Sequence, residues 1–177
     1  MKLMITLADG FEDIEAMVPI DILRRAGVTV DTVGVVGSVI TSKNGVRVMV
    51  DKRLSEVNPD SYDGIILPGG NPGYINLGRT AKIIEILKKM DSQGKLIAAI
   101  CGAPSVLAKA GVLDNKKATV HPGMEKELPY PRAERVVVDG NVITSQAPGT
   151  AMEFALALVE KIVGRGKVSE LRKDLVI

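Results

Sequence analysis

Three short and almost continuous apolar runs constrain the fold of this chain more than any other feature. They are Leu3–Leu7, Gly64–Leu67 and Leu96–Ile100. A strand that is apolar on both sides must be covered on both faces, as happens in a parallel sheet between two layers of helices. The runs therefore predict an α/β protein in which these three segments are parallel neighbours in one sheet.

Segments with helical spacing alternate with these strands. The first expected helix covers about residues 12–26, with Arg24 and Arg25 suited to its C-terminal dipole and Gly27 as its stop. Pro19 falls inside it and predicts a kink or a broken first turn. The other expected helices are Thr80–Met90, Ala103–Ala110, Gly149–Val163 and Val168–Leu175. Strands alternating with helices predict a mainly parallel central sheet with helices on both faces.

Two hairpins are expected beside the parallel strands. Asn44-Gly45 separates Val39–Thr41 from Val46–Val50, and Asp139-Gly140 separates Val136–Val138 from Val142–Thr144. Such dipeptides between apolar runs are strong turn signals, so the hairpins suggest an antiparallel edge. Further strands are expected at Val28–Val36 and just before His121. We expect residues 1–177 to form a single domain, since 177 residues suit one core.

Composition excludes several functional classes. The 23 Lys and Arg residues nearly balance 21 Asp and Glu, and the basic residues are scattered, so nucleic acid and anionic membranes are not expected partners. One Cys and one His argue against a disulfide, a cysteine metal cluster or a transition-metal site, and we expect no cofactor. No apolar run approaches membrane-spanning length, and a free thiol suits a reducing compartment. We therefore expect a cytoplasmic protein.

Cys101 is the strongest chemical candidate because it stands between a buried strand and the start of a helix. A sharp turn there would raise its side chain above the sheet, as in a nucleophile elbow. The free N–H groups of the helix would favour the thiolate, and a protonated carboxyl of Glu15 would do the same. We therefore expect a thiol pKa in the reactive range of ~3.5–7.5. The alternative is an inert buried cysteine.

Three further features lie at the expected carboxyl edge of the sheet. In the acidic turn after the first strand, Glu15 is a candidate general acid or base, although such carboxylates also complement a helix N-terminus. Gly69-Gly70 does not match a phosphate-binding loop and is either a plain turn or a source of a substrate-binding N–H. His121 is the only imidazole available to the cysteine.

Together these residues resemble the ThiJ/PfpI superfamily, and most of all the branch that contains the parkinsonism-associated deglycase/glyoxalase. The motifs that carry the resemblance are Ala8–Glu15, Pro19–Gly27, Leu67–Asn71, Ala98–Pro104, His121-Pro122 and Thr144–Thr150. The resemblance runs from about residue 3 to residue 165, nearly the whole chain.

The resemblance implies a flavodoxin-like three-layer sandwich and a homodimer that uses the first helix. It implies that Cys101 is the nucleophile, that Glu15 is hydrogen-bonded to its sulfur, and that His121 lies nearby. Gly70 and Gly102, with Gly69, would line the oxyanion and substrate site.

The activity implied is conversion of a 2-oxoaldehyde such as methylglyoxal to a 2-hydroxy acid, with glycation adducts as further substrates. One alternative is a redox-sensing or chaperone protein that uses an oxidisable Cys101. A cysteine peptidase is the other, although Gly102 stands where the peptidase branch has a histidine.

Overall fold

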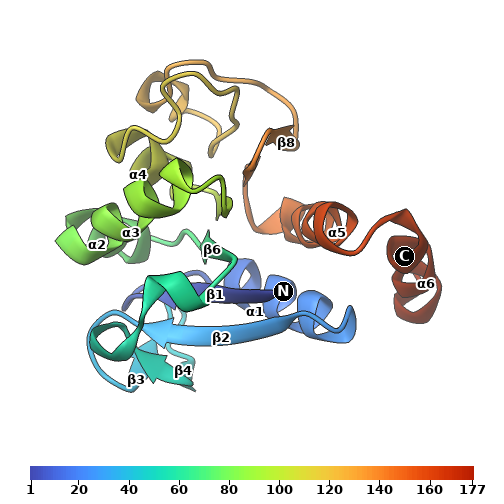
Figure 1. Cartoon of the computed structure of the whole chain (residues 1–177), viewed down its shortest axis with the longest axis horizontal. Coiled ribbons are helices and arrows are strands. Elements are labelled where there is room, and N and C mark those ends of the chain that lie inside the picture. The colour runs from blue at the N-terminus through green and yellow to red at the C-terminus, as the bar shows by residue number, and fades with distance from the viewer.

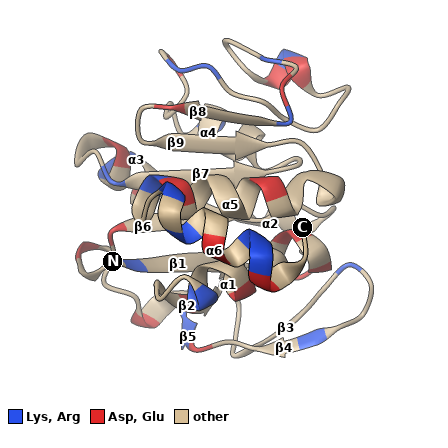
Figure 2. Ribbon diagram, turned by 90° about the vertical axis from the view of Figure 1, so that its right-hand side faces the viewer, with Lys and Arg blue, Asp and Glu red and all other residues tan.

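The computed structural model describes residues 1–177 and contains a seven-stranded sheet between two layers of helices (Figure 1). The strand order is β5-β2-β1-β6-β7-β9-β8, which Figure 2 shows from the bottom of the sheet to the top. The bounds are β1 Lys2–Leu7, β2 Thr29–Gly34, β5 Lys52–Arg53, β6 Gly64–Leu67, β7 Leu96–Ile100, β8 Val136–Asp139 and β9 Val142–Ser145.

The three apolar runs are parallel neighbours, as the sequence predicts. Leu3 pairs with Gly64 and Gly64 with Leu96, so β1, β6 and β7 lie side by side in register. With β2 and β9 they give the order 2-1-3-4-5 of a flavodoxin-like sheet, in which ligands bind at the carboxyl ends of the strands. The expected fold class is confirmed.

Each face of the sheet has its own apolar core. One core lies between the sheet and α1 (Asp13–Arg25), α5 (Ala151–Ile162) and α6 (Arg165–Leu175), which lie in front of the strands in Figure 2. The other lies under α3 (Ala81–Ser92) and α4 (Pro104–Lys109), beside α2 (Gly73–Arg79). Successive side chains of β1 point to opposite faces of the sheet and so contribute to both cores. Leu3 and Ile5 belong to the first core and Met4 to the second. No helix is both long enough and apolar enough to cross a bilayer.

Helix α1 runs without interruption through Pro19, so a broken first turn is wrong. Proline lacks an N–H, and at this position it removes only the bond that the carbonyl of Glu15 would accept. The side chain of Glu12 caps the helix by accepting from the N–H of Glu15 at 2.8 Å. The acidic turn therefore does complement the helix start, while Glu15 itself points inward and is fully buried.

Two other expectations about secondary structure need correction. The hairpin β3 (Val39–Thr41) and β4 (Arg47–Met49) forms a separate two-stranded sheet, and only β8–β9 supplies an antiparallel edge. The segment before His121 forms one isolated bridge, Ala118 with Pro131, instead of a strand.

Helix α2 was not expected, because Gly73 and Gly78 lower helical propensity. Both glycines serve packing instead. A Cβ at Gly73 would lie 2.6 Å from the nitrogen of Phe11, and one at Gly78 would lie 3.3 Å from Val106. Close approach of α2 to the backbone of Phe11 therefore requires a glycine at position 73, which weakens the sequence signal of the helix.

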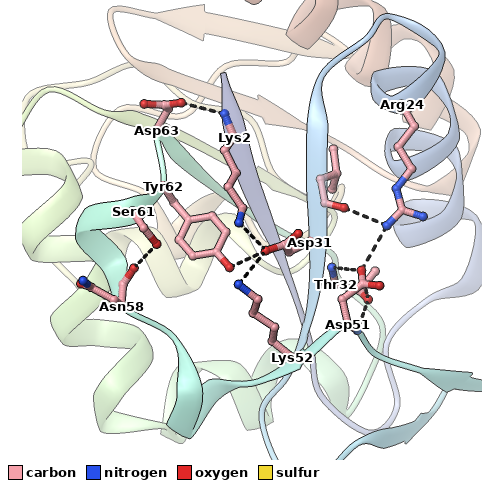
Figure 3. A network of polar contacts seen from close by, with 11 residues as sticks. Lys2, Arg24, Asp31, Thr32, Asp51, Lys52, Asn58, Ser61, Tyr62 and Asp63 are labelled. Atoms are coloured by element: carbon pink, nitrogen blue, oxygen red, sulfur yellow. Dashed lines mark hydrogen bonds and ion pairs between the residues drawn. The ribbon is translucent and has the colours of Figure 1, made fainter.

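A network of polar contacts links β1, β2 and β5 (Figure 3). Asp31 accepts a hydrogen bond from the hydroxyl of buried Tyr62 at 2.7 Å and pairs with Lys2 at 3.0 Å and Lys52 at 3.3 Å. Burial opposes ionisation of Asp31, but these three partners together hold its pKa below the ordinary value. The carboxylate thereby joins three strands to the segment that carries Tyr62.

We predict that Asp31→Asn lowers the free energy of unfolding by about 1–3 kcal/mol, since a neutral amide removes the charged acceptor of Tyr62, Lys2 and Lys52. Because the pKa of Asp31 is lower in the native state than in the unfolded state, the carboxylate stabilises the fold at pH values above the unfolded pKa of ~3.9. This stabilisation is lost as the pH falls through the native pKa. Thermal unfolding between pH 3 and 7 should therefore show the variant's deficit at pH 7 shrinking towards pH 3. A deficit that is equal at both ends would contradict a role for the ionised carboxylate. Asp21→Asn, on the exposed face of α1, is the control.

Candidate active site

Cys101 lies in a sharp turn between β7 and α4. Its φ of 64° is in the left-handed region, which L-residues rarely adopt and which costs about 1–3 kcal/mol. Two hydrogen bonds hold this conformation: the N–H of Cys101 donates to Ser145 at 3.0 Å, and the N–H of His121 donates to the carbonyl of Cys101 at 2.8 Å. The turn has the geometry of a nucleophile elbow, and it leaves the side chain half-buried at the carboxyl edge of the sheet.

The carboxyl group of Glu15 lies next to this sulfur. Its Oε2 atom accepts a hydrogen bond from the N–H of Gly69 at 2.8 Å. Its Oε1 atom is buried and has no protein partner with full hydrogen-bond geometry. The Cys101 thiol is nevertheless close enough for an interaction between the two groups to affect both pKa values. A buried carboxyl oxygen without a fixed partner is free to exchange a proton with the sulfur or with a bound molecule.

Burial raises the pKa of Glu15 to about 7, and the charge of Glu12 adds to the rise, while the thiol and the N–H of Gly69 oppose it. Burial also raises the pKa of Cys101 to about 12, followed by the charge and the hydrogen bond of Glu15. Two anions in contact in a buried site are costly, so the protons leave the pair in two steps. Between these values the pair holds one proton and one negative charge.

The expected thiol pKa of ~3.5–7.5 is therefore wrong in direction. The backbone donors at the elbow do lower the pKa of Cys101, but burial and the neighbouring carboxylate outweigh them. A transfer of the thiol proton to Glu15 would leave the net charge of the pair unchanged. Glu15 is thus placed to act as a local base for the thiol.

Two of the three glycines expected at the oxyanion site direct their N–H groups at the sulfur. These are Gly70 and Gly102, whose backbone N–H groups act on the Cys101 thiol and lower its pKa. Gly69 needs correction, because its N–H donates to Glu15 and is not available to a substrate oxygen. A Cβ at Gly69 would lie 2.6 Å from Glu15 Oε2 and 2.7 Å from the Cβ of Cys101. Glycine is therefore required where β6 ends between the two groups.

His121 lies at the rim, with an exposed side chain. Its Nδ1 atom is 2.9 Å from the carbonyl oxygen of Pro122, and no hydrogen bond joins the imidazole to the sulfur. A carbonyl partner fixes the proton on Nδ1, which leaves Nε2 as an acceptor. The imidazole is therefore placed beside the reacting groups without forming a Cys–His pair.

A cavity of about 350 Å³ opens above Cys101, within the size range of small-molecule sites. It is lined by Glu12, Glu15, Lys43, Gly70, Asn71, Tyr74, Cys101, Gly102, His121, Met124 and Pro148. Lys43, from the β3–β4 hairpin, and Tyr74, from α2, were not predicted, because no local motif marks them. No group of three or more His, Cys, Asp or Glu side chains could hold a metal ion.

Comparison with known proteins agrees with this geometry. The model of the DJ-1/PfpI family matches residues 1–161. This chain belongs to the DJ-1/PfpI family. It is 40% identical to Protein dj-1beta of Drosophila melanogaster over 98% of this chain and 96% of that protein. It is also 40% identical to a Pyrococcus abyssi protein named as a deglycase, over 84% of this chain and 92% of the relative.

The solved structures of family members have the same fold. Oxidised DJ-1 of Toxoplasma gondii superposes with a TM-score of 0.95 at 36% identity, covering 99% of this chain and 97% of that one. The family resemblance expected from the six motifs is thereby confirmed.

We predict that Glu15→Gln lowers the pKa of Cys101 below the wild-type value of about 12, because a neutral amide removes the repulsion by the carboxylate. Thiolate absorbance in the ultraviolet measures this directly, since Cys101 is the only cysteine. Glu12→Gln, which removes a carboxylate from the same cavity, should leave the thiol titration near that of wild type. An unchanged or higher thiol pKa in Glu15→Gln would contradict the paired site.

Proposed function

We propose that this protein converts small 2-oxoaldehydes such as methylglyoxal to 2-hydroxy acids, with Cys101 as nucleophile and Glu15 as proton carrier. The observation that carries the proposal is the contact between a fully buried carboxyl group and a thiol that two backbone N–H groups face. A thiol that is only structural needs neither the carboxyl group nor the N–H donors.

In the first step the thiol proton moves to Glu15 as the sulfur attacks the aldehyde carbon. An S–C bond forms, and the carbonyl π electrons pass to the oxygen, where the N–H groups of Gly70 and Gly102 stabilise the charge. Glu15 then gives its proton to this oxygen. The product is a neutral hemithioacetal beside a Glu15 carboxylate.

In the second step the carboxylate removes the proton from the carbon bonded to sulfur, which gives an enediolate. The hydroxyl proton on that carbon's oxygen passes to the oxygen of the adjacent carbon, and Glu15 returns its proton to the adjacent carbon itself. The result is a thioester of the 2-hydroxy acid. Water gives a proton to Glu15 as it attacks this thioester, and the thiolate leaves as the free acid forms. Glu15 then returns the proton to the sulfur, which restores the starting pair. One water is consumed for each 2-oxoaldehyde, the oxidation states balance within the substrate, and no external oxidant, metal or cofactor takes part.

The same nucleophile supports action on early glycation adducts, in which a carbonyl compound has added to an amine or a thiol. The name of the Pyrococcus abyssi relative, a deglycase, supports this extension. A free reactive thiol persists best in a reducing compartment, which favours the cytoplasm.

A homodimer is part of this proposal. Apolar side chains remain exposed on α1 and on the β3–β4 hairpin. The turn of the hairpin touches the start of the helix, since Ser42 and Asn44 donate hydrogen bonds to Asp13. Figure 2 labels both elements. Ile14 and Met17 are 49% and 37% exposed on the helix, and Met49 is 79% exposed on the hairpin. A second copy that packs on the first helix would cover such a surface.

Redox sensing is the second candidate function. It is favoured by the single, half-buried thiol and by the oxidised form in which the Toxoplasma gondii relative was solved. A sensor needs only an oxidisable sulfur, whereas turnover also needs a proton carrier. Loss of turnover in a variant that keeps its thiol therefore separates the two functions.

We predict lactate formation from methylglyoxal by the wild-type protein and none above background by Cys101→Ser. Glu15→Gln should lower kcat by about 10²–10⁴-fold, the usual contribution of a general acid or base. His121→Ala should keep measurable turnover, because its imidazole bonds to Pro122 and not to the sulfur. Equal losses in His121→Ala and Cys101→Ser would assign the base to His121, and wild-type activity in Glu15→Gln would refute the proton carrier.

A further inference from the structure

A second hollow lies beside the active cavity. It has a volume of about 580 Å³ and is bounded by α2, α4 and the segment around residues 127–129. Charged and polar side chains line it, among them Arg79, Lys109, Asp114 and Glu127. Of all the residues that line the two spaces, Tyr74 alone belongs to both. Tyr74 is therefore the wall between the smaller cavity above Cys101 and the larger hollow.

Neighbouring residues fix the position of Tyr74 in this wall. The N–H of Tyr74 donates to the carbonyl of Gly70 at 2.9 Å, which ties the start of α2 to the turn that carries one oxyanion donor. The ring packs directly on Gly102, the other donor, because a Cβ there would lie 2.8 Å from two ring carbons. The ring thus stands next to both N–H groups that face the sulfur.

The hydroxyl group of Tyr74 makes no hydrogen bond to any protein group, whereas the ring contacts the site. The contact that ties Tyr74 to the site is made by its ring, and the bulk of the ring is the property on which the wall depends. We propose that the Tyr74 ring is the specificity-determining wall of the active site, which restricts it to small carbonyl compounds by closing it off from the second hollow. The part of this inference that concerns carbonyl substrates rests on the proposed function. The part that concerns the space above the sulfur does not.

The first test uses Cys101 as a reporter and needs no enzymatic activity. Iodoacetamide and its N-benzyl derivative both alkylate a thiolate with loss of iodide, so the ratio of their rate constants measures the space above the sulfur. We expect Tyr74→Ala to raise the ratio of bulky to small reagent by at least about tenfold, the usual effect of pocket size on selectivity. Tyr74→Leu should give an intermediate ratio, and Tyr74→Phe should keep the wild-type ratio.

Ile75→Ala is the matched control, because Ile75 lines only the second hollow. It enlarges that hollow and leaves the wall in place, so its reagent ratio should equal that of wild type. Circular dichroism and the thermal midpoint confirm that each variant is folded before its ratio is compared. An unchanged ratio in folded Tyr74→Ala and Tyr74→Leu, or an equal rise in Ile75→Ala, would overturn the proposal.

The second test compares kcat/KM for phenylglyoxal and methylglyoxal in the same variants. A rise in the phenylglyoxal preference of Tyr74→Ala supports the wall as a determinant of substrate size. Turnover with unchanged preference in every variant overturns this role while leaving the proposed function intact. A changed reagent ratio without turnover in the wild-type protein supports the wall and refutes the proposed function, so the two failures are distinguishable.

Discussion

The left-handed backbone of Cys101 is the constraint on which the rest of the site depends. Such a conformation persists only where surrounding structure holds it, and here β9 and the segment at His121 each supply one hydrogen bond. Those bonds place Ser145 and His121 at the same edge of the sheet as the sulfur. The following residues then turn into α4, so the N–H of Gly102 faces back towards the thiol. Three separate segments thus meet at one strained residue, and two of them hold its conformation.

A second constraint is the burial of Glu15. The helix that carries it begins at a capped turn, so its third residue points into the molecule instead of into water. In that position the carboxyl group has one backbone donor and one oxygen without a partner, and its pKa rises to about 7. The site therefore holds a proton at neutral pH that neither group controls alone, which is the property that the proposed reaction uses.

The sequence predicted the parts of this structure that depend on local pattern. Continuous apolar runs identify β6 and β7, and the change from strand to helix at Cys101 identifies the elbow. Sequence-based prediction failed where the role of a residue depends on a contact with a residue far away in the chain. The N–H of Gly69 bonds to a carboxylate 54 positions away, and no local motif shows that this donor is engaged. The thiol pKa was misjudged for the same reason, since its sign depends on how closely Glu15 approaches. Tyr74 lies on α2, a helix that the sequence does not predict because Gly73 and Gly78 lower its helical propensity.

The single cysteine also decides how this protein can recover from oxidation. A sulfenic acid at Cys101 has no second thiol in the chain with which to form an intramolecular disulfide. Return to the thiol must therefore draw on a thiol from outside the chain that reaches the sulfur through the cavity. The same opening that admits substrate is then the route of repair, and any side chain that narrows it also slows the rescue of the oxidised protein.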